Sequence, residues 1–163
     1  MNDTQDRLQL LLDLQKELDS LPKVDNPSYE HGGVIRYLVQ TGITHIDKNG
    51  VAHGVHDLTI PPEMLAEMIQ AIGAKASVED MEEWIQRVIH AVISELMEML
   101  RHLRFKWWSD KVCFEPQKLR EEFVDVIHFI LSLALHLGFN AEELLEEYQK
   151  KHRENQERAE GAY

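Results

Sequence analysis

The sequence has little of what marks a secreted, membrane-spanning or nucleic-acid-binding protein. Its single cysteine, Cys113, cannot form an internal disulfide and no secretory signal opens the chain, so we expect a reducing, cytoplasmic location. The 17 basic residues are outnumbered by 29 acidic ones, and a net charge of −12 argues against a nucleic-acid or anionic-membrane surface. The longest apolar run, Phe123–Leu137, is too short to span a membrane. An anionic ligand would therefore need a local cationic patch or metal ions.

Internal repeats and a glycine-rich phosphate loop are also absent, and hydrophobic periodicity predicts helices. Leucines recur at three- and four-residue spacings over Asp6–Leu21, which predicts an amphipathic helix that stops near Pro22. A capping-box pattern at residues 77–80 predicts the start of a long helix that we expect to run to about Arg104. Leu119–Gly138 is predicted to form one buried helix, and a charged helix should follow it from Asn140.

The segment from about residue 26 to residue 76 is less regular. Apolar residues and histidines alternate over 43–55 around a turn at 47–50, which predicts a β-hairpin, and paired prolines predict a short helix over 61–72. The 163 residues are enough to bury one core, so we predict a single domain over 1–163. The predicted fold class is all-α: a helical bundle with an irregular insertion after its first helix.

Two acid pairs lie within the apolar helices. Glu95 and Glu98 are three residues apart on one predicted helix, and Glu122 and Asp125 are three apart on the other, so each pair shares a helix face. Four carboxylates brought together repel one another unless cations hold them. Because oxygen ligands suit Mg²⁺ or Mn²⁺, and bound Mg²⁺ often contacts substrate phosphates, the pattern predicts a metal site.

Each acid pair taken alone is a weak signal, because most acids of this spacing on helices are solvated. Asp125 could equally be a core acid satisfied by a hydrogen bond, and His128 could bond a carbonyl instead of a ligand. Near the C-terminus, Lys151, Asn155 and Arg158 recur at helical spacing. Such a charge run is usually a solvated surface, but this one could also bind phosphate groups.

The order of these motifs resembles a known family. The sequence ELMEMLRHLRFKWWS at 95–109, followed by EEFVDVIHFILSL, resembles the paired motifs of the all-α dimeric dUTPases, relatives of the MazG-like nucleotide pyrophosphatases. The first helix, with LLDLQKELD, and the tail, with a K-x-x-x-N-x-x-R pattern, resemble the family's opening and closing motifs. Residues 26–76 match nothing in that family.

The resemblance implies hydrolysis of dUTP to dUMP and pyrophosphate by a homodimer, with Mg²⁺ held by Glu95, Glu98, Glu122 and Asp125. Glu98, with Glu95 as the second candidate, would orient or deprotonate the attacking water. It also implies a set of substrate-binding residues for the base, the sugar and the phosphates: Gln15, Lys106, Trp107, Trp108, His128, Phe129, Lys151, Asn155 and Arg158.

Three alternatives remain open. A MazG-like pyrophosphatase of other or broader nucleotide specificity would use the same four acids. A ferritin-like di-iron oxidase would use inward acids with His102 and His128, although neither glutamate pair is followed by the expected histidine. A non-enzymatic helical dimerisation module would bind no metal and turn over no substrate.

Overall fold

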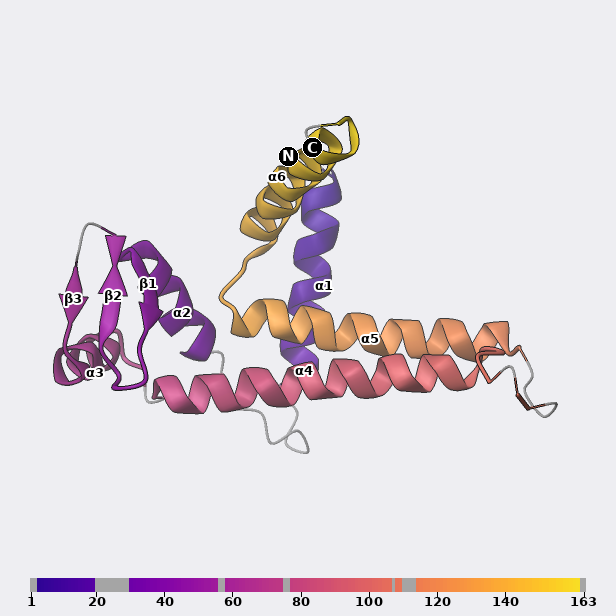
Figure 1. The fold of residues 1–163 in the computed structure, drawn as a ribbon, viewed down its shortest axis with the longest axis horizontal. Coiled ribbons are helices and arrows are strands. Elements are labelled where there is room, and N and C mark those ends of the chain that lie inside the picture. Colours follow the sequence, from indigo (N-terminus) through magenta and orange to yellow (C-terminus); the bar gives the residue numbers. More distant parts are fainter. Residues whose placement is uncertain are drawn as a thin grey trace.

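The computed structural model describes residues 3–19, 30–55, 58–74, 77–106, 108–109 and 114–161. Within this part of the chain the elements, in order, are α1 (Asp3–Asp19), α2 (Glu30–Gln40), β1 (Ile43–Ile46), β2 (Ala52–Gly54), β3 (Thr59–Ile60), α3 (Pro62–Ala71), α4 (Val78–Arg101), α5 (Pro116–His136) and α6 (Ala141–Ala159). Helices dominate and the strands form one small sheet (Figure 1), so the predicted all-α fold class is confirmed.

The two longest helices, α4 and α5, lie side by side in opposite directions (Figure 1). The predicted capping box starts α4: the Asp80 backbone N–H donates to Ser77 Oγ at 3.1 Å, and the Ser77 backbone N–H donates to Asp80 Oδ2 at 3.0 Å. The helix ends at Arg101 and not near Arg104, because the His102 carbonyl accepts a hydrogen bond from the Glu115 backbone N–H at 3.1 Å. The chain therefore leaves α4 where it meets the start of α5.

The segment predicted to be irregular is more ordered than expected. It contains α2, which the sequence did not predict, as well as the predicted hairpin of β1 and β2 and the predicted short helix α3. A third strand, β3, pairs antiparallel with β2, so the sheet order is β1-β2-β3. The described part of this segment thus consists mainly of regular helices and strands.

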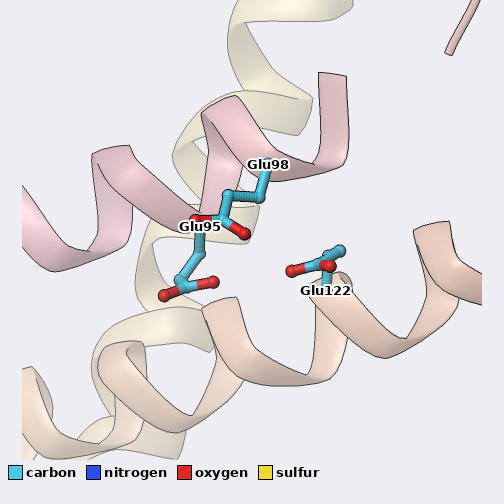
Figure 2. Close-up of side chains that lie close together, drawn as sticks. All are labelled: Glu95, Glu98 and Glu122. Carbon is cyan, nitrogen blue, oxygen red and sulfur yellow. The ribbon is translucent and has the colours of Figure 1, made fainter. Parts of the chain in front are cut away.

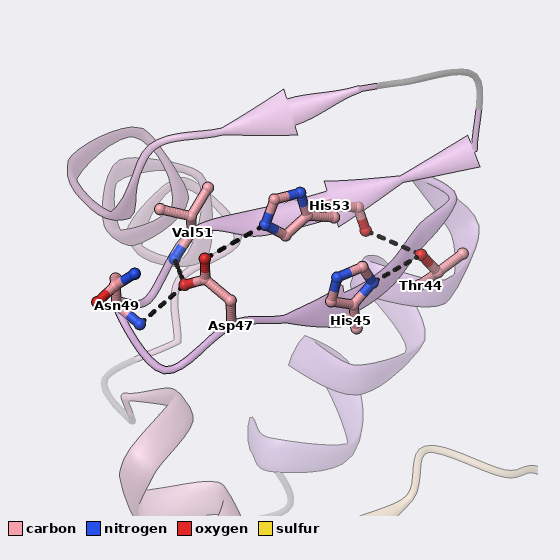
Figure 3. Close-up of polar contacts among 6 residues, drawn as sticks. All are labelled: Thr44, His45, Asp47, Asn49, Val51 and His53. Atoms are coloured by element: carbon pink, nitrogen blue, oxygen red, sulfur yellow. Dashed lines mark hydrogen bonds and ion pairs between the residues drawn. The ribbon is translucent and has the colours of Figure 1, made fainter.

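Side chains fix the turn of the hairpin (Figure 3). Asp47 Oδ1 accepts hydrogen bonds from the backbone N–H groups of Asn49 and Val51, at 2.8 and 3.1 Å, and these bonds lower the pKa of Asp47. The cross-strand partners His45 and His53 stack their rings with centroids 4.5 Å apart. These local contacts explain why the alternating pattern forms a hairpin.

Buried apolar side chains form two clusters in the described residues. One cluster joins α2, the sheet, α3 and the start of α4: Val34, Leu38, Ala52, Ile60, Leu65, Ile69 and Met81. The other joins α1, α5 and the start of α6: Leu12, Leu131, Leu135 and Ala141. Both cores lie near the end of the α4–α5 pair where α4 begins and α5 ends, whereas the acids lie in the second half of α4 and the first half of α5, toward the other end.

A close backbone approach links the insertion to the corner between α5 and α6. Gly138 ends α5 as predicted, with φ of +83°. A Cβ atom on Gly32 would lie 2.2 Å from the Leu135 carbonyl oxygen, and one on Gly138 would lie 2.3 Å from the Gly32 carbonyl oxygen. Arg36 adds hydrogen bonds to the Gly138 carbonyl and, at 2.8 Å, to Glu143. Only glycine permits helix α2 to pack this tightly.

The prediction that residues 119–138 form a buried helix is wrong in part. The last turns of α5, over 131–136, are largely buried, but Phe123, Val124 and Asp125 in its first half are exposed. Large apolar side chains are likewise exposed on α1 and α4, including Leu11, Leu14, Ile93, Leu96 and Met97. These helices therefore carry more apolar surface than the rest of the same chain buries.

No single helix in the described residues is long and apolar enough to cross a membrane. Among the described helices, the pair α5 and α6 reaches the required length and composition together, with a bend of 104° between them.

Candidate metal centre

Three of the four predicted metal ligands converge between α4 and α5. Glu95 and Glu98 extend from α4, and Glu122 extends from α5 (Figure 2). Each offers a carboxylate oxygen, and these oxygens all lie within 4.8 Å of one another. All three residues are half-buried. A divalent cation with oxygen ligands suits this arrangement, because it offsets the mutual repulsion of the three charges.

The pKa of Glu95 is raised above its ordinary value. Partial burial is the largest cause, and the negative charges of Glu98, Asp125 and Glu122 add to it. Burial and its acidic neighbours therefore disfavour the ionised form of Glu95, and a bound cation would offset this effect.

Asp125 lies one helical turn beyond Glu122 on α5. It is exposed in this chain, so the expectation of a buried acid is not met. Its charge is still close enough to raise the pKa of Glu95. Asp125 therefore borders the cluster of three glutamates and stays a predicted ligand.

His102 joins two carboxylates beside the cluster. Its side chain is 14% exposed, its Nδ1 lies 2.9 Å from Glu115 Oε2, and its Nε2 lies 3.4 Å from Glu122 Oε1. Glu115 also accepts a bond from Lys118 at 2.8 Å, and these partners, Lys118 first, lower the pKa of Glu115. From the sequence, His102 was predicted only as a possible iron ligand, and Glu115 was not predicted to have a role. One signal for His102 was present in the sequence: it follows Glu98 by four residues, a spacing that places two side chains on the same side of a helix.

Gln15, predicted to contact the base, lies in a polar network between α1 and α5. It is buried, with 4% of its surface exposed. Its Oε1 lies 2.9 Å from His128 Nδ1, and its Nε2 donates to Asp19 Oδ1 at 2.6 Å. Ser132 Oγ donates to Asp19 Oδ2 at 2.9 Å. The structure thus brings together Gln15 and His128, which were predicted separately, and adds two residues that the sequence analysis missed.

The F-K-W-W sequence follows α4. Lys106 and Trp108 are exposed, and the Lys106 ammonium lies 5.6 Å from the centre of the Phe105 ring. Trp107 lies outside the described residues. Phe129, predicted to border the sugar, is half-buried on α5.

The predicted phosphate-binding residues are exposed on α6, which packs against α1 and rises away from the α4–α5 pair (Figure 1). Lys151 pairs with Glu154 at 2.7 Å, and Asn155 and Arg158 lie along the same helix. Within this chain, α6 is directed away from the half of α4 and α5 that carries the acids.

The fold and the cluster together define an all-α protein with a candidate site for a divalent cation. A family model described as dUTPase matches residues 62–141, which confirms the predicted relation to the all-α dUTPases. The match runs from the start of α3 to the first residue of α6, so the expectation that residues 26–76 match nothing in the family is wrong for residues 62–76. It includes all four acids, the F-K-W-W sequence and His128. Gln15 and the basic residues of α6 lie outside it. No curated protein and no solved structure matched the chain.

The match to this family model bears on the chemistry in two ways. A dUTPase is a hydrolase, and such enzymes generally require a metal ion. The family match and the glutamate cluster, found independently of each other, therefore point to the same part of the molecule.

Proposed function

We propose that this protein hydrolyses dUTP to dUMP and pyrophosphate, using Mg²⁺ held by Glu95, Glu98, Glu122 and Asp125. The observation that carries the proposal is the convergence of three of these carboxylates, from two helices, inside the stretch that matches the dUTPase family. Mn²⁺ is the natural substitute, since it accepts the same oxygen ligands.

The chemistry divides among the residues of the cluster. Bound Mg²⁺ would supply a Lewis acid that neutralises the phosphate oxygens of the substrate. Glu98 is the proposed acid that orients or deprotonates the attacking water, with Glu95 as the second candidate. Glu95 and Glu98 lie on one face of α4, so both can reach the site. One of them would then face the water while the other would bind the metal.

Base selection is assigned to Gln15, with Trp107 or Trp108 against the base and Lys106 beside them. An amide has two N–H donors and two carbonyl lone pairs, and the bonds to Asp19 and His128 use one of each. One donor and one acceptor therefore remain, and recognition of a uracil edge uses groups of both kinds.

His128 and Phe129 are assigned to the sugar side of the pocket. Both lie on α5 within two turns of Glu122, and His128 reaches Gln15. The proposed nucleotide site therefore extends along α5, from Glu122 at one end to His128 and its partner Gln15 of α1 at the other.

The active form is proposed to be a homodimer. Apolar side chains exposed on α1, α4 and α5 offer a surface that a second copy would bury. In such a dimer, the α6 of one copy would bring Lys151, Asn155 and Arg158 as phosphate ligands to the acids of the other copy. Within a single chain, α6 does not reach these acids. Light scattering should then give twice the mass of the chain.

The test is a nucleotide panel. The full chain, with Mg²⁺, is incubated with dUTP, dUDP, dCTP, dTTP and dATP, and release of pyrophosphate and phosphate is measured separately. We expect dUTP to yield dUMP and pyrophosphate, EDTA to abolish turnover, and Glu98→Gln to lower kcat by at least 10²-fold, as loss of an acid–base group does. The proposal of a uracil-specific enzyme is wrong if dUTP survives while other nucleotides are cleaved.

That last outcome would favour a MazG-like pyrophosphatase of broader specificity. No metal binding and no turnover of any nucleotide would favour a helical dimerisation module. Calorimetry with Mg²⁺ separates the module from both enzymes.

A further inference from the structure

Glu122, a candidate metal ligand, is in contact with His102, which belongs to neither acid pair. The imidazole of His102 lies between the carboxylates of Glu122 and Glu115, with one ring nitrogen toward each, and is largely shielded from water. A histidine placed in this way has little conformational freedom. Its position is therefore a structural constraint on both carboxylates.

The backbone reinforces the arrangement. The Glu115 N–H donates to the His102 carbonyl at 3.1 Å, while the Glu115 carboxylate contacts His102 Nδ1 at 2.9 Å. Residues 102 and 115 are thereby tied together twice. The connection from α4 to α5, which carries the F-K-W-W sequence, begins and ends at this pair.

Glu122 needs such a constraint. A glutamate side chain has three rotatable bonds, and holding it in one geometry costs conformational entropy. Its neighbours Glu95 and Glu98 carry the same charge and repel it when no cation is bound. The imidazole of His102, whose Nε2 lies 3.4 Å from Glu122 Oε1, limits the directions in which the carboxylate can turn.

We propose that His102 is a positioning residue of the metal site: it holds the Glu122 carboxylate in place and connects it, through Glu115, to the base of the F-K-W-W segment. The inference rests on the proposed function, because it takes Glu122 as a metal ligand. Histidine acts here as a partner of a ligand and not as a ligand itself, since only glutamates make up the cluster found among the described residues.

The experiment measures metal affinity without turnover. Mn²⁺ is titrated by calorimetry into the nucleotide-free full chain and into His102→Phe, which keeps a planar ring but has no ring N–H. Partners of metal ligands typically contribute 10–100-fold to affinity, so we expect the Kd for Mn²⁺ to rise by that factor. His102→Gln keeps an N–H donor and should restore part of the affinity.

His90 supplies the matched control, because it is an exposed histidine on the same helix α4. His90→Phe should keep the parental Kd within twofold. Glu115→Gln tests the other end of the contact without touching His102, and it should weaken binding in the same direction by a smaller factor. It also serves as the deciding variant if His102→Phe does not fold.

The outcomes separate this inference from the function on which it rests. If Glu122→Gln loses Mn²⁺ binding while His102→Phe, or Glu115→Gln in its place, keeps the parental Kd, the positioning role is refuted and the metal site stands. If Glu122→Gln itself binds Mn²⁺ like the parent, Glu122 is not a ligand and both proposals fail.

Discussion

Replacing Glu95 by glutamine should stabilise the metal-free protein, which is the opposite of what loss of a half-buried polar group usually does. The pKa of Glu95 is raised by burial and by the charges of Glu98, Asp125 and Glu122, so its ionised form is unfavourable in the folded chain. Glutamine keeps the shape of the side chain and removes that charge.

The magnitude follows from the geometry. Two unit charges 4.8 Å apart, the outer limit within this cluster, repel by about 1 kcal/mol in water and by roughly 3 kcal/mol at an effective dielectric constant of 20. Because the carboxylates are only half-buried, solvent screening places the gain near the lower figure, about 1 kcal/mol. For a chain of 163 residues this corresponds to roughly 2–4 °C in Tm.

The size of this Tm difference also depends on pH. A carboxyl group whose folded pKa is raised stabilises the fold while it is protonated, and that contribution is lost as pH rises through the raised pKa. The Tm of Glu95→Gln in EDTA should therefore exceed that of the parent at pH 7, and the difference should shrink as the pH is lowered into the acidic range.

Thermal melts of both proteins, in EDTA and in Mg²⁺, measure the effect. Mg²⁺ at 100 times its Kd should stabilise the parent by about 2.7 kcal/mol and the variant far less, because a ligand stabilises only the state that binds it. A fall of several degrees for Glu95→Gln in EDTA would refute the reasoning. It would show that the carboxylate has a stabilising partner and not a set of repelling neighbours.

Two further predictions concern other parts of the molecule. Gly138→Ala should cost more than Gly73→Ala: both glycines have positive φ, a strain of about 1–2 kcal/mol for alanine, but only at Gly138 would the new Cβ meet backbone, the Gly32 carbonyl oxygen at 2.3 Å. Equal losses in urea unfolding would argue against the close α2–α5 approach. Arg158→Ala should raise KM for the nucleotide without lowering Tm, and in a shared site its mixture with Glu98→Gln should regain activity. Unchanged kinetics would assign this part of α6 to solvated surface.

The sequence predicted best what depends on neighbouring residues. The capping boxes at the starts of α4 and α6 need only a side chain and a backbone N–H three residues away, and both form as the pattern indicates. Likewise, three-residue spacing was enough to place Glu95 and Glu98 on one face, where they meet Glu122.

Helix α2 was missed because its sequence argues locally against a helix. Gly32 and Gly33 each cost about 1 kcal/mol of helix propensity relative to alanine. What offsets this cost is a tertiary contact, the approach of Gly32 to the Leu135 carbonyl and to Gly138, and no local pattern reveals it.

The exposure of Asp125 and the contacts of His102 were missed for a similar reason. A run of apolar residues shows that a helix has surface to bury, but not which side one chain covers. The contacts of His102 with Glu115 and Glu122 depend on how the connection between α4 and α5 folds back. Distances across a connection cannot be read from spacing along it.

The carboxylate of Glu143 has two tasks, and this has a consequence for the whole molecule. Its Oε2 accepts from the Asn140 backbone N–H at 3.1 Å, which caps α6, and from Arg36 of α2 at 2.8 Å, although Arg36 lies 107 residues earlier in the chain. The segment that contains α2 therefore supports the start of α6 through this contact. A shortened chain that lacked it would have to find a new anchor for that carboxylate, and would lose the support that sets the direction in which α6 carries its basic residues.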